Sequence, residues 1–360
     1  MSLHFQKLKI KEVRKETDDC VSIAFEVPPE LKEAYLFSHG QNITLRTFIG
    51  GMDTRRSYSI CAAPHENELR VAVKKAAFGV FSRFANEQLK AGDEIDVLPP
   101  TGKFFTKLDA GHKKNYLALA AGSGITPVIS IIKTTLREEP FSRFTLVFGN
   151  RDRRSVIFLE ELEALKNRYL ERFSLVHVLS RERTDAGINA GRINPAKLDE
   201  LGKLLDYQTI DEIFICGPEE MVFSTERYLA GKGVDKKKIH FELFSTPGTA
   251  GKAKPETKET NPGDPGLIST VTIKIDGRSF DFGLPYDGDT ILNAALKQGA
   301  DLPYACKGGV CASCRARLTE GEVEMEMNWA LEPEEVEQGY ILTCQSHPKT
   351  KKIAIDFDNR

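Results

Sequence analysis

The sequence of 360 residues predicts a multidomain protein: an antiparallel β-barrel, an α/β domain with a parallel sheet, and a smaller α+β domain. Short segments with alternating apolar residues, separated by Gly, Pro, Asn and Asp turns, fill residues 5–107 and are typical of a barrel. From residue 115, apolar strands alternate with helices, as in a parallel sheet with crossovers. A stretch rich in Gly, Pro, Thr and Lys then precedes a β-rich end. We expect domains at 1–110, 111–244 and 269–360, with a flexible linker at 245–268.

The first domain shows its alternation most clearly at residues 21–27 and 68–74. Inside it, Arg56, Tyr58 and Ser59 lie on a predicted strand. These three residue types also occur on ordinary polar strands near a turn, so the pattern alone does not establish a binding site.

A short helix is predicted to begin at Gly79 and to run through Leu89, with Ser82 in its first turn. Free N–H groups and a hydroxyl at a helix start can bind an anion such as a pyrophosphate. The pattern alone also fits an ordinary helix start.

The second domain is predicted from five apolar strands and four helices with apolar residues at helical spacing. Asn194 and Pro195 form a plausible cap and first-turn pair. The expected strands are 116–121, 144–149, 173–180, 212–217 and 239–244, and the expected helices are 128–137, 156–170, 195–205 and 219–229.

Two loops of this domain have the composition of a nucleotide site. The loop from Gly122 to Pro127 leads from a strand directly into a helix, where small residues admit a pyrophosphate to helix N–H groups. It is not G-x-G-x-x-G, so the ordinary Rossmann fingerprint is absent. Cys216, Gly217 and Pro218 end another strand. Because both loops follow parallel strands, we expect them at one edge of the sheet.

The third domain is expected to begin with a hairpin around Asp276 and Gly277. A helix at 290–298 follows, with Asp289 as its expected cap. Two short segments are expected around 316–323 and 341–345, and a last strand is expected at 352–357.

Four cysteines of the third domain have the spacing of a cluster site. Cys306, Cys311 and Cys314 follow C-x4-C-x2-C, and Cys344 lies farther along. This is the ligand pattern of a plant-type [2Fe-2S] ferredoxin. The glycines at 308–309 supply backbone freedom and N–H groups for cluster sulfurs. Zinc also takes four thiolates and stays an alternative, although zinc sites usually show two matched C-x2-C pairs.

Composition excludes several other functions. A net charge of −2 with 28% charged residues gives no nucleic-acid footprint and no polybasic membrane patch. No apolar run approaches the roughly eighteen residues of a spanning helix, and the start lacks the apolar core of a signal peptide, so we expect a cytoplasmic protein. The other three cysteines, Cys20, Cys61 and Cys216, lie far apart, which argues against a disulfide framework.

Together these motifs resemble the ferredoxin-NADP reductase family followed by a plant-type ferredoxin domain with a β-grasp fold, over nearly the whole chain outside the linker. The resemblance implies FAD on the barrel. Arg56 would bind the flavin pyrophosphate, Tyr58 would stack on the isoalloxazine, and Ser59 would lie near flavin N5 as a catalytic residue.

The resemblance also implies the remaining site residues. Cys216 would lie near the nicotinamide, Glu242 would assist hydride or proton balance, and Phe244 would cover the flavin until nicotinamide displaces it. A buried thiol, a solvated carboxylate and a core aromatic are the alternatives for these three. Further flavin residues would be Val73, Lys75, Gly79, Val80 and Ser82. Further nucleotide residues would be Gly122, Ser123, Gly124, Thr126, Gly217 and Pro218. The cluster ligands would be Cys306, Cys311, Cys314 and Cys344.

Coenzyme choice depends on the group that meets the adenosine ribose. Ser180 and Arg181 are similar to a motif of NADPH-using relatives, and a 2′-phosphate favours arginine and hydroxyl groups. We therefore expect NADPH, with Arg154 and Arg192 nearby. A solvated ion pair between Arg181 and Glu182 is the alternative.

This domain order resembles that of reductase components of bacterial oxygenases, and most of all the reductases of phenylacetyl-CoA epoxidase complexes, whose partner holds a di-iron site. The expected activity is transfer of single electrons from hydride-reduced FAD through the cluster to that oxygenase. Phthalate-dioxygenase-type reductases share the order but use FMN, and the helix start at Gly79 favours FAD. The alternatives are an NADH-dependent reductase of a Rieske dioxygenase or another acceptor, and a redox-sensing or zinc-stabilised binding module.

Overall fold

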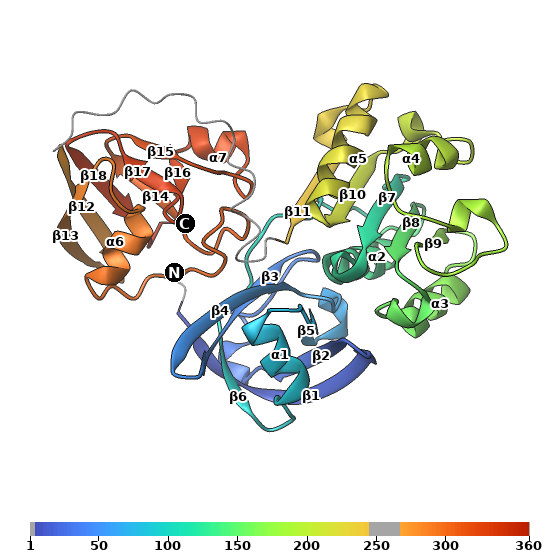
Figure 1. The fold of residues 1–360 in the computed structure, drawn as a ribbon, viewed down its shortest axis with the longest axis horizontal. Coiled ribbons are helices and arrows are strands. Elements are labelled where there is room, and N and C mark those ends of the chain that lie inside the picture. Colours follow the sequence, from blue (N-terminus) through green and yellow to red (C-terminus); the bar gives the residue numbers. More distant parts are fainter. Residues whose placement is uncertain (1–3, 245–266, 360) are drawn as a thin grey trace. The chain divides into compact units, whose positions relative to one another are not determined.

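The computed structural model describes residues 4–244 and 267–359 (Figure 1). These residues form two compact units. The first comprises Lys7–Thr54 and Tyr58–Phe244, and the second comprises the described residues of Met1–Gln6, Arg55–Ser57 and Ser245–Arg360. The expected linker at 245–268 lies, except for its last two residues, outside the described residues. Among the described helices, none has the length and apolarity needed to cross a membrane.

The first unit begins with a six-stranded sheet in the order β4-β3-β6-β1-β2-β5. After β4 the chain bridges back to β5 through the pair Ile60 and Val71, and this closes the predicted antiparallel barrel. The one α-helix of this part, α1 (Val80–Glu87), packs Phe81 and Ala85 into the barrel core. The strands are β1 (Gln6–Thr17), β2 (Cys20–Glu26), β3 (Asn42–Ile49), β4 (Met52–Ser59), β5 (Leu69–Lys74) and β6 (Glu94–Val97).

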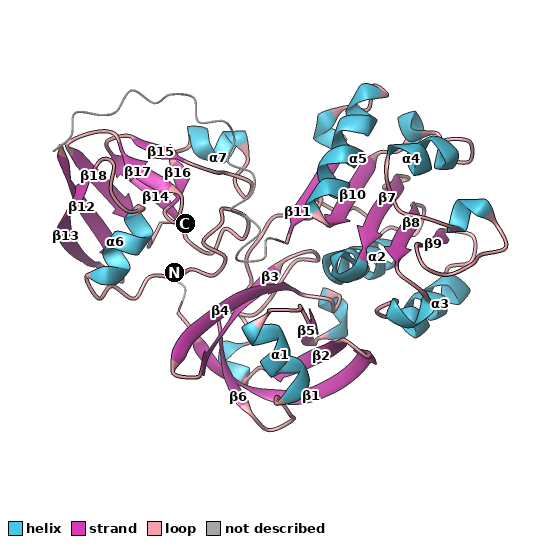
Figure 2. Cartoon of the chain, viewed as in Figure 1, coloured by secondary structure: helices cyan, strands magenta, loops and turns pink. Residues whose placement is uncertain are grey.

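The rest of the first unit is the predicted parallel sheet of five strands, and helices cover both of its faces (Figure 2). The strand order is β11-β10-β7-β8-β9, and each neighbouring pair is parallel. The strands are β7 (Asn115–Ala121), β8 (Arg143–Asn150), β9 (Phe173–Leu179), β10 (Glu212–Gly217) and β11 (Ile239–Leu243). The helices are α2 (Ile125–Glu138), α3 (Leu159–Arg168), α4 (Pro195–Leu201) and α5 (Glu219–Gly231).

Two helix starts differ from the expected ones for local reasons. Helix α2 begins at Ile125 and tolerates Pro127 in its first turn. The N–H groups of a first turn have no intrahelical partner, so a proline there loses no hydrogen bond. Helix α3 begins only at Leu159, because Phe158 takes a left-handed conformation with φ 61°. The expected cap of α4 is confirmed, since the Asn194 side chain accepts from the Lys197 N–H at 2.9 Å.

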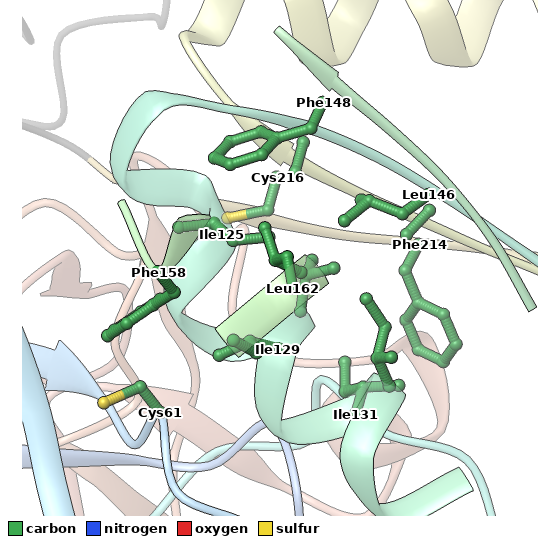
Figure 3. Packing of buried hydrophobic residues seen from close by; sticks show 14 of the residues in the cluster. Cys61, Ile125, Ile129, Ile131, Leu146, Phe148, Phe158, Leu162, Phe214 and Cys216 are labelled. Atoms are coloured by element: carbon green, nitrogen blue, oxygen red, sulfur yellow. The ribbon is translucent and has the colours of Figure 1, made fainter. Parts of the chain in front are cut away.

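The core of the parallel-sheet part lies between the sheet and α2 (Figure 3). Ile125 and Ile129 of α2 pack there with Phe148 and Phe214 of the sheet, and each of these side chains is fully buried. Burial of an apolar side chain of this size contributes roughly 1.5–3 kcal/mol. Helix α2 is therefore held firmly along its length.

The second unit contains a mixed five-stranded sheet in the order β13-β12-β18-β14-β16 and a two-stranded sheet of β15 and β17. Helix α6 packs its buried residues, including Ile291 and Leu292, into this unit's core. The predicted hairpin is present, and both Asp276 and Gly277 have positive φ, as a two-residue turn of this kind requires. The elements are β12 (Ile268–Ile275), β13 (Arg278–Pro285), α6 (Ile291–Lys297), β14 (Arg315–Glu320), β15 (Val323–Met325), α7 (Pro333–Glu337), β16 (Tyr340–Leu342), β17 (Ser346–Pro348) and β18 (Lys352–Asp356).

The expected cap of α6 was wrong by one residue. Thr290, not Asp289, is the N-cap, because its hydroxyl accepts from the Asn293 N–H at 3.4 Å. Asp289 instead forms an ion pair with Lys297 at the other end of the helix.

Candidate functional site

The two expected nucleotide loops meet at the edge of the parallel sheet. Strands β7 and β10 are neighbours although β8 and β9 intervene in sequence, so the chain reverses its direction of winding between them. Ligands of open α/β sheets bind at the carboxyl ends of the strands at such a point. The turn Gly122–Gly124 follows β7, and Cys216 and Gly217 end β10.

The contact between these loops leaves no room for a side chain at Gly124. A Cβ atom built there would lie 2.0 Å from the carbonyl oxygen of Cys216, which is a backbone atom and cannot rotate away. Thr126 closes the same turn by donating its hydroxyl hydrogen to the Ser123 carbonyl at 3.0 Å. The glycine thus allows the two loops to share one edge.

Cys216 is completely buried at this edge. Burial raises the pKa of its thiol well above the ordinary value, and the nearby Glu242 charge raises it further. Cys216 lies opposite Glu242 in the register of β10 and β11. It is therefore a neutral thiol in the wall of the site.

Ser59 and Glu242 meet, although 183 residues separate them in sequence. The Ser59 hydroxyl donates to the Glu242 carboxylate at 2.9 Å. Ser59 ends barrel strand β4 and is only 3% exposed, whereas Glu242 lies on β11 of the parallel sheet. The structure thus brings the three predicted catalytic residues, Ser59, Cys216 and Glu242, to one place.

The predicted flavin-stacking residue Tyr58 lies against Phe81 of α1, with ring centroids 5.5 Å apart and planes tilted by 38°. Sequence reasoning did not select Phe81, although it stands between the selected Val80 and Ser82. Arg56, two residues before Tyr58 on β4, donates from its guanidinium to the Arg55 carbonyl at 2.6 Å.

The turn before α1 is tightly built. A Cβ atom at Gly79 would lie 2.2 Å from the Ser82 hydroxyl oxygen. That hydroxyl accepts from the Ala76 N–H at 3.0 Å and donates to the Gly79 carbonyl at 3.2 Å. Ser82 therefore shapes the turn, while Val80 at the helix start is 45% exposed.

Val73 and Lys75 lie beside this turn but offer little to a ligand through their side chains. The Val73 side chain is fully buried in the barrel core, and its carbonyl accepts from Asn86 at 3.0 Å. The Lys75 ammonium lies 3.0 Å from Glu87. Their expected contacts with the flavin stay predictions.

Arginines gather at the carboxyl ends of β8 and β9. Ser180 donates its hydroxyl hydrogen to the Asn150 carbonyl at 3.3 Å, and the Arg181 N–H bonds the Arg151 carbonyl at 2.7 Å. The Glu182 carboxylate accepts from the backbone N–H of Arg153 at 2.7 Å. These bonds fix the two loops that hold the expected 2′-phosphate residues.

The four cluster cysteines lie as two pairs. The Cys306 thiol donates to Cys311, and this bond lowers the pKa of Cys311 below the ordinary value of a thiol. In the same way, the hydrogen bond from Cys314 lowers the pKa of Cys344.

Hydrogen-bond donors surround these sulfurs. The Gly308 N–H bonds the Cys306 sulfur at 3.3 Å, and the Gln345 amide lies 3.8 Å from the Cys344 sulfur. Gly309 has φ 74°, and a Cβ there would lie 2.9 Å from the Met327 carbonyl oxygen. Gln345 was not predicted, although its place directly after Cys344 offered a signal.

This arrangement fits a [2Fe-2S] cluster, in which four thiolates serve two irons and N–H groups bond the sulfurs. A single zinc ion needs its ligands around one point, whereas these thiols lie as two pairs.

Two features stand apart from the assembled site. Phe244 ends the described part of the first unit and is 40% exposed, so its expected place over the flavin stays a prediction. A cavity of about 500 Å³ lies at the opposite, amino edge of the parallel sheet. Its lining residues are Thr106, Lys107, Asp109, His112, Lys114, Glu212, Lys237 and His240.

Models of three known protein families match three separate parts of this chain. Residues 7–106 match the oxidoreductase FAD-binding domain, residues 118–227 match the oxidoreductase NAD-binding domain, and residues 273–349 match the 2Fe-2S iron-sulfur cluster binding domain.

Similar proteins match this chain over nearly its whole length. The chain is 44% identical to one of the subunits of the 1,2-phenylacetyl-CoA epoxidase of Escherichia coli K12, over 98% of both chains. It is 34% identical to the ferredoxin reductase component of the 3-ketosteroid-9-alpha-monooxygenase of Rhodococcus rhodochrous, over 97% of this chain and 96% of that one. The structure of phthalate dioxygenase reductase has the same fold, with a TM-score of 0.58, 24% identity and 98% of both chains covered. The chain therefore belongs to the family of ferredoxin reductases with FAD-binding, NAD-binding and [2Fe-2S] domains that serve as reductase components of oxygenases.

Proposed function

We propose that this reductase oxidises NADPH and supplies single electrons to a di-iron oxygenase that acts on phenylacetyl-CoA. The observation that carries the first half is the hydrogen bond between Ser59 and Glu242, which joins the FAD-binding barrel to the sheet edge beside Cys216. The second half is supported by the 44% identity to the protein of the Escherichia coli epoxidase over nearly the full length of both chains.

The chain's own residues prepare the site for hydride transfer. Bound FAD takes two electrons as hydride and gives them up singly, which neither a nicotinamide nor a one-electron iron-sulfur centre can do alone. Glu242 holds the Ser59 hydroxyl in one orientation, because the carboxylate accepts its hydrogen. The buried, neutral Cys216 completes the wall without adding a charge.

The preference for NADPH is supported by Arg181 and by the arginines of the loop after β8. A 2′-phosphate is best met by guanidinium groups, which bind phosphate oxygens in pairs. Arg151, Arg153 and Arg181 lie in two loops held together by hydrogen bonds of their backbone N–H groups. The Glu182 carboxylate accepts a hydrogen bond from the backbone N–H of Arg153. This contact weakens the alternative in which Glu182 forms an ion pair with Arg181.

Anaerobic stopped-flow reduction with NADPH and NADH in parallel tests this preference. Faster flavin bleaching with NADPH at low coenzyme concentration is expected. Arg181→Ala should raise the KM for NADPH about tenfold or more and leave the KM for NADH unchanged, because one guanidinium–phosphate contact contributes about 1.5–3 kcal/mol. Arg143→Ala, at the opposite end of β8, is the matched control. Equal rates with both coenzymes would contradict the preference.

The acceptor is tested with purified oxygenase components. Reduced protein should reoxidise rapidly with a phenylacetyl-CoA epoxidase and slowly with a Rieske dioxygenase. The reverse order would favour the alternative acceptor. The domain boundaries, the linker at 245–268 and the cytoplasmic location remain part of this proposal.

A further inference from the structure

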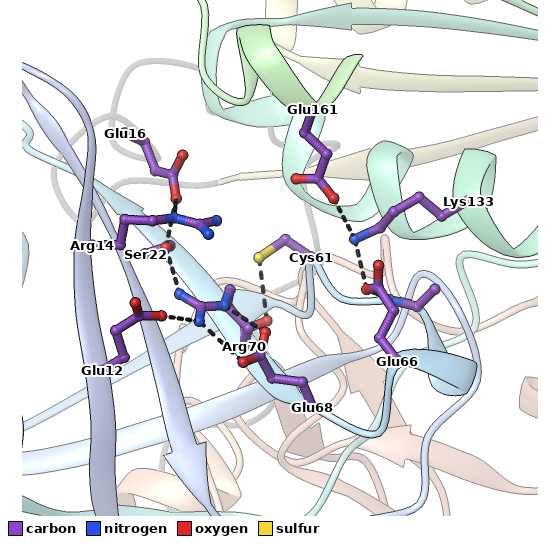
Figure 4. A network of polar contacts seen from close by, with 11 residues as sticks. Glu12, Arg14, Glu16, Ser22, Cys61, Glu66, Glu68, Arg70, Lys133 and Glu161 are labelled. Carbon is purple, nitrogen blue, oxygen red and sulfur yellow. Dashed lines mark hydrogen bonds and ion pairs between the residues drawn. The ribbon is translucent and has the colours of Figure 1, made fainter. Parts of the chain in front are cut away.

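Helix α2 carries a buried cation that contacts two different parts of the first unit. Lys133 is only 8% exposed, and its ammonium lies 2.8 Å from the Glu66 carboxylate and 2.9 Å from the Glu161 carboxylate (Figure 4). Glu161 belongs to α3 of the same parallel-sheet part. Glu66, in contrast, belongs to the barrel part, in the short turn Pro64–Glu66.

On the barrel side, the contacts of α2 are made by the segment 59–66, which begins at Ser59. Seven residues after Ser59, the Glu66 carboxylate accepts from Lys133 and also from the Ala63 N–H at 2.7 Å. A second bond from α2 reaches the same segment, because Ser130 donates its hydroxyl hydrogen to the Ala62 carbonyl at 2.6 Å. Ser130 is completely buried, so this bond is shielded from water.

The same segment is also fixed to the barrel. The Cys61 N–H bonds the Arg70 carbonyl at 2.9 Å. The buried Arg70 guanidinium is in turn held by Glu68 at 2.7 Å, by Ser22 at 2.9 Å and by Glu12 (Figure 4). The chain after Ser59 therefore has rigid attachments on both sides.

These contacts form one continuous path between the two halves of the reaction site. Helix α2 begins directly after the turn Gly122–Gly124, and it is buried along nearly its whole length. We infer that Lys133 and Ser130 are positioning residues, which hold the nicotinamide loop at a fixed place relative to Ser59. They act through α2 and the segment from 59 to 66, and neither side chain is part of the reaction site.

The chemistry of the contact supports positioning rather than simple cohesion. A buried ion pair brings little net stability, because desolvation of the charges offsets their attraction. It does require one geometry, since both carboxylates must meet the same ammonium. Misplacement of reacting groups by about 1 Å can slow a reaction roughly a hundredfold, so a contact that fixes this geometry affects the rate.

The two carboxylates provide a matched pair of variants in the full-length, FAD-loaded protein. Glu66→Gln removes the charge on the barrel side and keeps an amide oxygen for the Ala63 N–H. Glu161→Gln removes the charge within the parallel-sheet part. Anaerobic stopped-flow should show hydride transfer to flavin about tenfold slower in Glu66→Gln, whereas Glu161→Gln should stay within about twofold of the wild type. Ser130→Ala should resemble Glu66→Gln.

Two further readouts separate positioning from loss of folding. The long-wavelength absorbance of the complex between reduced flavin and oxidised nicotinamide nucleotide should weaken in Glu66→Gln, while FAD content and coenzyme dissociation constant stay unchanged. Hydrogen exchange of residues 59–66, measured without nucleotide, should accelerate in Glu66→Gln more than in Glu161→Gln. Lys133→Arg should retain most of the wild-type rate, and Lys133→Met should not.

The outcome that would overturn the inference is equal hydride transfer in Glu66→Gln, Ser130→Ala and the wild type. An equal slowing in Glu66→Gln and Glu161→Gln would also overturn it, because the effect would then not depend on the barrel contact. The comparison uses whichever coenzyme the wild type oxidises faster, so it stands apart from the proposed NADPH preference and acceptor.

Discussion

At the scale of single residues, Gly124 shows how close the two nucleotide loops approach. We predict that Gly124→Ala lowers the free energy of unfolding by about 1–3 kcal/mol. The new methyl group would meet the carbonyl of Cys216, which belongs to the backbone and cannot rotate away. The loops must move apart, so affinity for the nicotinamide nucleotide should fall as well.

The control for this variant is Gly231→Ala at the end of α5, where an added Cβ meets nothing within 4 Å. It should be neutral or slightly stabilising, because alanine favours the helix. Chemical unfolding followed by circular dichroism, together with coenzyme titration, compares the two. Equal stability and affinity in both variants would show that the loops adapt freely.

The individual residues also show where sequence reasoning stops. The selection of Ser59 and Glu242 came from a family resemblance, and no local pattern could reveal that they share a hydrogen bond across 183 residues. Lys133 was missed because a lysine in a helical pattern is read as solvated, and only tertiary packing buries it between two carboxylates. Ser82 was selected for an anion, whereas its hydroxyl bonds its own turn.

At the scale of elements, the start of α6 allows a test of one cap. Thr290→Ala should destabilise the second unit by about 1 kcal/mol, because it removes the side chain that accepts the Asn293 N–H. Asp289→Ala removes only an exposed ion pair with Lys297 and should cost less than about half of that. Loss of cluster absorbance in a urea titration measures both. A larger effect at Asp289 would restore it as the cap.

The junction between α2 and β7 predicts a dependence of stability on pH. Burial alone raises the pKa of Glu139, but hydrogen bonds from Ser142, His112, Asp109 and Tyr116 outweigh burial, and the pKa lies below the ordinary 4.5. This carboxylate therefore stabilises the fold above pH 4.5, and its contribution disappears as the pH falls through the lowered pKa.

The measurement is chemical unfolding of Glu139→Gln and the wild type at pH 7 and near pH 4. The variant should be less stable at pH 7 and should lose less stability on acidification. Parallel losses in the two proteins would show that Glu139 does not account for the pH dependence. Glu138→Gln, the exposed neighbour, is the control.

Elements were predicted well where periodicity was strong and less well at their ends. The five parallel strands were placed within about one residue, because each is a short apolar run between polar turns. The start of α3 was missed, because a left-handed Phe158 has no sequence signature, and α4 ends at Leu201, four residues before its expected end. The order of the strands in each sheet depends on tertiary contacts.

At the scale of the whole molecule, electrons should enter as a pair in the first unit and leave singly through the second. Cys314→Ser in the full-length protein should lose the iron and most of the reduction of a one-electron acceptor. NADPH should still bleach the flavin at nearly the wild-type rate, because Ser59, Cys216 and Glu242 are untouched. Iron analysis and stopped-flow absorbance measure the two effects.

Cys20→Ser is the control, because this buried cysteine lies on β2 of the barrel and belongs to the first unit, whereas the four cluster cysteines belong to the second. Full iron content and undiminished acceptor reduction in Cys314→Ser would contradict this route.

The order of strands in the parallel sheet has an evolutionary consequence. The expected nicotinamide contacts follow β7 and β10 near the centre of the sheet, whereas the expected phosphate contacts of the adenosine end follow β8 and β9 toward one margin. Mutations that swap one coenzyme for another can therefore accumulate on that margin while the hydride-transfer geometry is inherited intact. Proteins that descend from one ancestor can in this way change their coenzyme and keep the same geometry of hydride transfer.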